Sequence, residues 1–182
     1  MPSRSTLIIS GALTPSSFRG PSLEPVRIRS ATPADIPQMF RLEQQAPFAP
    51  HWNSYQYEAL FATDAPSRIV LAAADEINKS EILGFLVSIC LPDDWEIESV
   101  VVDEAARRHG VGSQLLRELI LQAAGAGAPA LILEVRESNV PARQLYEKHG
   151  FVQESQRVNY YQGPLEPALL YRLPLQSCDK IP

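Results

Sequence analysis

The residues of this chain best suited to chemistry form a basic, glycine-containing turn at residues 107–112, with the sequence Arg-Arg-His-Gly-Val-Gly. Its two glycines, Gly110 and Gly112, lack a Cβ, so a ligand can approach the backbone closely. The segment after the turn has the spacing of a helix, whose first N–H groups would be unpaired and would carry partial positive charge. Together with the two arginines, these groups predict a site for phosphate, and in particular for pyrophosphate.

The same turn has an ordinary structural interpretation, as a strand-to-helix connection that happens to contain two glycines and two arginines. It lacks the third glycine of a dinucleotide-binding fingerprint. It also lacks the Gly-Lys-Ser/Thr sequence that ends a Walker A loop. The turn by itself therefore leaves both interpretations open, and the second half of the chain has to decide between them.

A carboxylate on an expected strand beside the turn could act as a general base. Glu134 ends the apolar strand 130–135, and a carboxylate shielded from water there would have a raised pKa, which suits a base. Glu96 begins the strand 96–102 that precedes the turn. Glu98 shares a face with Glu96 by strand alternation, so repulsion would raise the pKa of one of them if both point into a cleft.

Structural roles also fit these residues. Glu134 could instead pair with Arg136 or Arg157. Tyr146, twelve residues after Glu134, falls on the inner face of the next expected helix. There it could donate a proton, or it could be a core aromatic residue whose hydroxyl is satisfied. The residues alone favour the core role for this tyrosine.

The elements that must position these groups follow from hydrophobic periodicity. Apolar positions repeat every four residues from Val111 to Ala123, which predicts a helix with one buried stripe. Because this helix connects the strands at 96–102 and 130–135, those strands are expected to be parallel. Other helices are expected from Thr32, Ser54 and Asn139, and other strands at residues 26–29, 68–74, 82–89, 151–161 and 168–173.

The first expected helix leads into a proline-broken aromatic loop at residues 46–53. Such a loop either packs onto the core or walls the mouth of a substrate site, since binding residues concentrate on loops. The inner face of the helix is expected to consist of Ile36, Met39, Phe40, Leu42 and Glu43.

The composition is that of a soluble globular protein, with 45% hydrophobic and 20% charged residues. The formal net charge of -5 argues against general nucleic-acid binding, and no apolar run is long enough to span a membrane. The two cysteines, Cys90 and Cys178, are far apart, which favours free thiols in a reducing, cytoplasmic compartment. The three histidines are scattered, so no metal site is predicted.

Domain boundaries follow from a change in composition near residue 25. Residues 1–24 are rich in Ser and Pro and contain Arg4 and Arg19, but no acidic residue before Glu24. They are expected to be a disordered leader, with an organellar transit peptide as the alternative. Residues 25–176 are expected to form one domain, followed by a tail at 177–182.

Taken together, these patterns resemble a known family. The pattern Arg107-x-x-Gly110-x-Gly112 after a valine-rich strand resembles the acetyl-CoA pyrophosphate turn of the GNAT N-acetyltransferase superfamily. Residues 133–161 are similar to its RimI-like branch, whose members acetylate the N-terminal alanine of a small-subunit ribosomal protein. The resemblance covers about residues 26–175. The chain departs from the branch at Glu98, where an aliphatic residue is usual, and at Pro167, where an acidic residue is expected and where proline fits a strand start or an edge.

The resemblance implies an α/β (α+β) GNAT fold. Its central mixed, mostly antiparallel sheet has six to seven strands and is flanked by about four helices. Two central parallel strands are splayed to admit acetyl-CoA. It also implies roles for the candidate chemical groups: Glu134 is the base, Tyr146 is the acid, and Glu96 is the rival base.

Binding roles follow from the same resemblance. The residues implied to contact acetyl-CoA are Val100, Val101, Val102, Arg107, Arg108, His109, Gly110, Val111, Gly112, Ser113, Asn139 and Tyr146. The residues implied to contact the acceptor are Glu43, Trp52, Tyr160 and Tyr161.

The implied reaction is transfer of an acetyl group from acetyl-CoA to the N-terminal α-amine of a protein. Two other functions stay open. One is a GNAT enzyme that acetylates a small amine such as a polyamine or an antibiotic, which Glu96 and Glu98 would favour if they line the acceptor groove. The other is an acyl-CoA-binding sensor without catalysis, which would be expected to lack the carboxylate and the tyrosine.

Overall fold

The computed structural model describes residues 26–63, 66–76 and 81–175. The expected leader at 1–24 and the tail at 177–182 lie outside these residues, as does Cys178. The elements in chain order are β1 (Val26–Ser30), a 3₁₀ turn (Pro33–Asp35), α1 (Ile36–Gln44), α2 (Ser54–Ala59), β2 (Arg68–Asp75), β3 (Ile82–Cys90), β4 (Trp95–Val102), a second 3₁₀ turn (Glu104–Ala106), α3 (Val111–Gly125), β5 (Ala130–Arg136), α4 (Val140–Lys148), β6 (Val152–Tyr161) and β7 (Glu166–Pro174).

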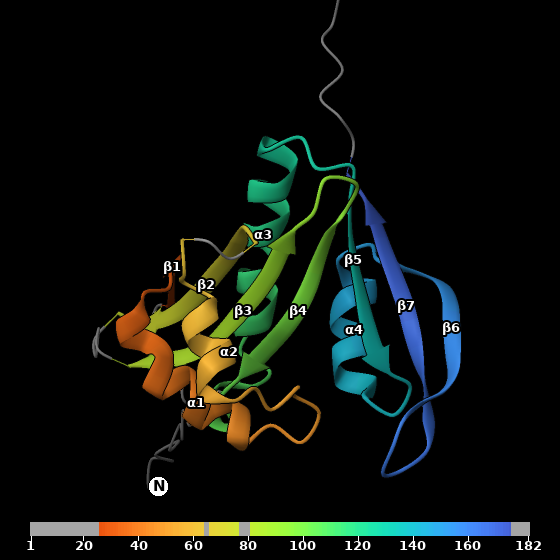
Figure 1. Cartoon of the computed structure of the whole chain (residues 1–182), viewed down its shortest axis with the longest axis horizontal. Helices are drawn as coiled ribbons and strands as arrows, with labels where there is room; N and C mark the ends of the chain where they lie inside the picture. The colour runs from red at the N-terminus through yellow and green to blue at the C-terminus, as the bar shows by residue number, and fades with distance from the viewer. Residues whose placement is uncertain (1–25, 64–65, 77–80, 176–182) are drawn as a thin grey trace, which may run out of the picture.

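The strands form one seven-stranded sheet in the order β1-β2-β3-β4-β5-β7-β6 (Figure 1). Neighbours pair antiparallel except for β4 and β5, which are parallel and are joined by α3. This arrangement confirms the expected mixed, mostly antiparallel sheet. Pro167 is the second residue of β7, a strand start where its missing N–H is tolerated.

The parallel pair β4–β5 is short, and its strands then separate. Pairing runs only from Trp95 with Leu131 to Ile97 with Leu133, although both strands continue beyond these residues. Figure 1 shows β4 and β5 diverging toward the bottom of the view. Their closed end is held by Arg172 of β7, whose guanidinium donates two hydrogen bonds of 2.6 and 2.8 Å to Asp94. The expected splay is therefore present.

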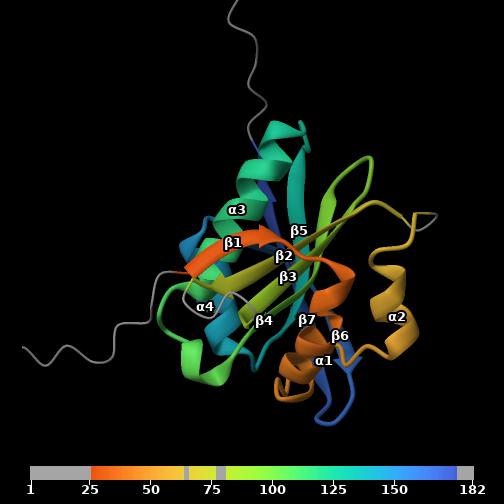
Figure 2. The ribbon, with the colours of Figure 1, turned by 90° about the vertical axis from the view of Figure 1, so that its left-hand side faces the viewer.

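The helices cover both faces of the sheet, with α3 and α4 on one face and α1 and α2 on the other (Figure 2). On the first face the apolar stripe of α3, which repeats every four residues from Val111 to Ala123, is fully buried, as the periodicity predicts. On the second face Met39 and Leu42 of α1 pack against Tyr57 of α2. Among the described residues, no helix is long and apolar enough to cross a membrane.

The start of α1 agrees with expectation, whereas its inner face differs in one residue. Thr32 is the N-cap of a 3₁₀ turn that leads into the helix, with proline in the first turn, and the Asp35 carboxylate accepts the Thr32 N–H at 2.8 Å while also pairing with Arg29. Phe40 was expected on the inner face and is instead 41% exposed. Successive side chains of an α-helix point about 100° apart, so Phe40 points away from the direction of its fully buried neighbour Met39.

A β-bulge in β4 sets which of its side chains face the splay. Val87 of β3 pairs with Ser99, and the next residue, Ser88, pairs with Ile97, so Glu98 is the extra residue. A bulge of this kind re-aims the side chains around it. The Ser88 hydroxyl donates to the Glu96 carbonyl oxygen at 2.9 Å and secures the irregular stretch.

Gly84 of β3 allows the close approach of β4 beside the splay. A Cβ at this buried position would lie 2.7 Å from the Val101 carbonyl oxygen and 3.2 Å from the Val102 Cα. We expect Gly84→Ala to lower the free energy of unfolding by about 2 kcal/mol, because the clash is with backbone. Denaturant titration measures this. Gly125→Ala is the matched control, since a Cβ there meets nothing within 4 Å; equal stability of the two variants would contradict the explanation.

Candidate active site

A cavity of about 640 Å³ lies where β4 and β5 separate. Its walls come from β4, the turn before α3, the start of α3, the end of β5, α4 and the loop between α1 and α2. Most of the candidate residues line it: Val100, Val101, Val102, Arg107, Arg108, Gly110, Val111, Gly112, Ser113, Glu134, Asn139, Tyr146 and Tyr161. The cavity thus brings together residues that lie far apart in the sequence.

Five candidates do not line the cavity: Glu43, Trp52, Glu96, His109 and Tyr160. His109 is exposed on the turn, and Tyr160 is 47% exposed on β6. Trp52 packs edge-on against Tyr57, with ring centroids 5.7 Å apart, so it belongs to the core between α1 and α2. Their placement gives no support to direct contact with a ligand in this cavity.

One end of the cavity is formed by the start of α3. Gly110 precedes the helix with φ of 87°, a left-handed conformation that suits glycine. The first helical N–H to find a backbone partner is that of Gln114, which donates to Gly110 O. No side chain in the described part of the chain hydrogen-bonds to the three amides before it, so they are available to an anion. Exposed Arg107 and Arg108 border the same place.

Gly112 has a packing role as well. A Cβ at this residue would lie 3.2 Å from Leu145 Cδ2 and 3.6 Å from Val102 Cγ2. Its absence lets the start of α3 approach both α4 and β4. The two glycines of the turn therefore act differently: Gly110 supplies the backbone conformation and Gly112 supplies the space.

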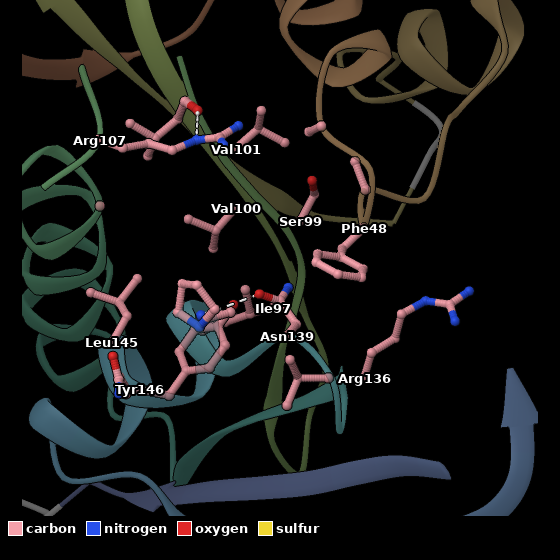
Figure 3. Close-up of a pocket in the computed structure, with 18 of the residues that line it drawn as sticks. Phe48, Ile97, Ser99, Val100, Val101, Arg107, Arg136, Asn139, Leu145 and Tyr146 are labelled. Atoms are coloured by element: carbon pink, nitrogen blue, oxygen red, sulfur yellow. Dashed lines mark hydrogen bonds between the residues drawn. The ribbon is translucent and has the colours of Figure 1, made fainter. Parts of the chain in front are cut away.

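The middle of the cavity follows the free edge of β4. Beyond Ile97 the edge of β4 that faces β5 has no strand partner, while its other edge stays paired with β3. An extended ligand with amide groups could therefore bond to this edge in place of a strand. Arg107 Nε already donates to Val102 O at 3.2 Å (Figure 3). Asn139 both borders this region and caps α4 by accepting the Ala142 N–H at 3.3 Å.

Tyr146 is held on the inner face of α4, where it borders the cavity. The residue is 7% exposed, and its ring packs against Phe151 at 5.7 Å. Burial, together with the neighbouring Tyr161, raises the pKa of the Tyr146 phenol. The phenol therefore keeps its proton at neutral pH, which a general acid requires. Core packing and proton donation are compatible here.

Glu134 reaches the cavity from the end of β5. Its carboxylate lies 3.1 Å from the guanidinium of Arg157, which projects from β6 and is 56% exposed. Of the two ion pairs that the sequence allowed for Glu134, the one with Arg157 is present. Arg136 instead pairs with Glu166 at 2.7 Å. An exposed pair of this kind is weak, about 0.2–1 kcal/mol, so it does not prevent Glu134 from meeting a substrate.

The two acidic residues of β4 differ from expectation. Glu98, and not Glu96, borders the cavity, and Arg68 of β2 binds its carboxylate with distances of 2.7 and 3.1 Å. Glu96 is half-buried, and its pKa is raised first by burial and then by the nearby charges of Glu134 and Glu98, with Arg157 acting in the opposite direction. The bulge at Glu98 separates their roles, which simple strand alternation could not foresee.

The side of the cavity away from α3 contains two residues, Phe48 and Arg136, that were not among the individual site residues expected from the sequence. Phe48 of the α1–α2 loop lies beside Ser99, on the other side of β4 from Leu145 and Tyr146 (Figure 3). Arg136 stacks its guanidinium over the Tyr161 ring, 4.0 Å from the centroid. The aromatic loop was a signal for Phe48, and the two-residue spacing from Glu134 was a signal for Arg136. Among the described residues, no group of three or more His, Cys, Asp or Glu could hold a metal ion.

Comparison with known proteins identifies the family and the fold of the chain. Residues 36–151 match the acetyltransferase (GNAT) family. The chain is 31% identical over 150 residues to the ribosomal protein bS18-alanine N-acetyltransferase of Escherichia coli K12, covering 81% of this chain and 97% of that protein. The crystal structure of the E. coli ribosomal-protein-S18-alanine N-acetyltransferase superposes with a TM-score of 0.74 at 26% identity, over 86% of this chain and 99% of that one. A Salmonella typhimurium putative acetyltransferase, yncA, solved with its cofactor acetyl-CoA, shares the fold at 20% identity, with a TM-score of 0.69 over 85% of this chain and 96% of that one.

Proposed function

The chain belongs to the GNAT family of acetyltransferases, and on that premise we propose that it uses acetyl-CoA to acetylate the N-terminal alanine of a small-subunit ribosomal protein. N-acetyl transfer from acetyl-CoA is the activity of the family. The ribosomal acceptor comes from the similarity to the bS18-alanine enzyme and to its crystal structure. The same proposal implies a cytoplasmic enzyme.

The observation that carries the proposal is the convergence of three groups on one cavity. The uncapped start of α3 suits the diphosphate of acetyl-CoA, and the free edge of β4 suits the pantetheine amides. Glu134 and Tyr146 line the same cavity from β5 and α4. A thioester laid along β4 would therefore lie within the space that both side chains border.

These two side chains supply the proton transfers of the reaction. An α-amine has a pKa near 8 and is mostly protonated at neutral pH, so it must lose a proton to attack the thioester carbonyl. In our proposal Glu134 accepts that proton. When the tetrahedral intermediate collapses, the carbon–sulfur bond breaks and the Tyr146 phenol donates its proton to the departing thiolate of coenzyme A. The amide product keeps the acetyl group.

A protein N-terminus fits the charges of the acceptor side better than a polyamine does. A polyamine would require several unpaired carboxylates along its path. Of the acidic residues that border the cavity among the described residues, Glu98 lies 2.7 Å from Arg68 and Glu134 lies 3.1 Å from Arg157, so each has a cationic neighbour. Aromatic Phe48 and Tyr161 instead offer surface to a peptide that continues beyond its first residue.

A turnover assay on a panel of amines tests the proposed function. We expect acetylation of a peptide that begins Ala-Arg, and no acetylation of the same peptide with a blocked N-terminus. Spermine and an aminoglycoside serve as the competing acceptors, and turnover on them alone would favour the small-amine enzyme. Binding of acetyl-CoA without turnover on any amine would favour the sensor.

Arg157 is expected to set the acidic limit of this activity. Its cation stands 3.1 Å from Glu134 and lowers the pKa of Glu96. Removing it in Arg157→Met should raise the pKa of Glu96, so this carboxyl group beside Glu134 gains its proton at higher pH. The acidic limb of the kcat/KM profile should then move upward by roughly half a pH unit, a modest shift because the arginine is exposed. Arg157→Lys keeps the charge and should leave the limb in place; a limb that moves equally in both variants would contradict the explanation.

A further inference from the structure

Glu43 of α1 is a buried carboxylate that the proposed chemistry does not use. The residue is 0% exposed, and its Oε2 accepts the Trp52 N–H at 2.8 Å. Its Oε1 and the Tyr57 hydroxyl have no hydrogen bond of good geometry within the described residues. Burial raises the pKa of the carboxyl, and the nearby Tyr57 hydroxyl and Trp52 amide offset this only in part. A half-satisfied buried carboxyl destabilises a fold, which suggests a role other than stability.

The hydrogen bond that Glu43 accepts from Trp52 connects α1 to the end of the α1–α2 loop that precedes α2. Residues 46–50 of this loop line the cavity. The first half is held by backbone bonds, in which Ala46 N donates to Glu43 O at 2.9 Å and Ala49 N donates to Ala46 O at 3.1 Å. The second half passes through His51, a non-glycine residue with φ of 55°. That conformation is unfavourable, and the bond from Glu43 to the next residue, Trp52, holds the chain just after it.

The loop stands on the acceptor side of the cavity. The start of α3, where the diphosphate is proposed to bind, belongs to the face of the sheet covered by α3 and α4. Loop 46–50 comes from the opposite face, covered by α1 and α2, and presents Phe48 beside Ser99 (Figure 3). A change in the loop would therefore alter the space for the acceptor while leaving the proposed diphosphate site intact.

We propose that Glu43 is a positioning residue, which fixes loop 46–50 as the acceptor wall through the Trp52 amide and never touches the substrate. The proposal rests on the proposed function in one respect, namely that the acceptor enters on this side. It also explains why a glutamate expected to contact the acceptor is found in the core. The position needs an acceptor atom at the Trp52 N–H, and not a negative charge.

Two substitutions separate this role from a purely structural one. Glu43→Gln keeps an oxygen that can accept the Trp52 N–H, whereas Glu43→Leu removes it and leaves an apolar side chain among Met39, Leu42 and Tyr57. We expect the acceptor KM of Glu43→Leu to rise about tenfold, the equivalent of one lost hydrogen bond, with the KM for acetyl-CoA within about twofold of the wild type. Glu43→Gln should keep both values near those of the wild type. Gln44→Leu, which introduces leucine at the exposed neighbouring residue, is the control.

Hydrogen exchange at the Trp52 amide gives a readout that does not depend on the acceptor. The amide should be protected in the wild type and in Glu43→Gln, and should exchange faster in Glu43→Leu. If Glu43→Leu does not fold, Glu43→Met provides the same loss of the acceptor atom with a flexible side chain. An unchanged acceptor KM in the apolar variant, or an equal rise in both KM values, would overturn the proposal. Failure of the wild type to acetylate any peptide would reject the proposed function alone, because the exchange experiment would still test the loop.

Discussion

Replacing Tyr146 with phenylalanine is expected to lower kcat by about 10²–10³-fold, while the Kd for acetyl-CoA stays within about twofold. The phenol is the proton donor in the proposed mechanism, and its raised pKa keeps it protonated at the pH of the reaction. The ring, however, packs against Phe151 and needs no hydroxyl for that contact. Loss of the oxygen should therefore affect the chemical step and leave binding largely unchanged. Steady-state kinetics with the Ala-Arg peptide and calorimetric titration of acetyl-CoA measure the two quantities.

The control for this substitution is Tyr55→Phe. Tyr55 is 78% exposed on α2 and lies outside the cavity, so the loss of its hydroxyl should change neither kcat nor Kd. If Tyr146→Phe weakened acetyl-CoA binding as much as it slowed turnover, the tyrosine would serve binding and not proton transfer. Thermal unfolding of both variants shows whether either change reflects a damaged core.

The second large effect is expected at Glu134. Glu134→Gln should lower kcat/KM for the peptide by about 10²–10⁴-fold, because the amide has the shape of the carboxylate but cannot take the proton of the amine. Glu134 borders the cavity, whereas Glu96 does not. Glu96→Gln is therefore expected to cost less than about tenfold, through its charge alone. Parallel kinetics on the two variants compare the rival bases directly.

The alternative outcome of this comparison is equally informative. A larger loss in Glu96→Gln than in Glu134→Gln would transfer the role of the base to Glu96, whose pKa is raised by its burial and by its acidic neighbours. Arg157 loses its partner in Glu134→Gln, but its exposure keeps the cost of the unpaired cation small. A large change in stability is therefore not expected to obscure the kinetic result.

The elements of the fold could be predicted from the sequence because their signals are local. The four-residue apolar repeat located α3, and the Asn139 side chain with the following proline located the start of α4. The splay of β4 and β5 came from the family resemblance, since periodicity shows where strands lie and not where their pairing stops.

The details of the site that escaped prediction depend on contacts between distant segments. The bulge at Glu98 is set by the register with β3, and it reverses which β4 glutamate meets the cavity. Trp52 and Phe48 are both aromatic residues of one loop, and only the packing of Trp52 on Tyr57 decides that Phe48 is the one left at the cavity. Glu43 lies on the inner face of α1, as the periodicity predicts, but the resemblance implied that it contacts the acceptor, and it does not line the cavity.

The uncapped start of α3 has a consequence for control of the enzyme. Its amides and the two arginines would recognise the diphosphate, a part that acetyl-CoA shares with the free coenzyme A released by the reaction. Binding at this end of the cavity would therefore not distinguish acetyl-CoA from free coenzyme A. Free coenzyme A would then compete with acetyl-CoA for the same site. The rate of acetylation would follow the ratio of acetyl-CoA to coenzyme A and would fall as that ratio falls.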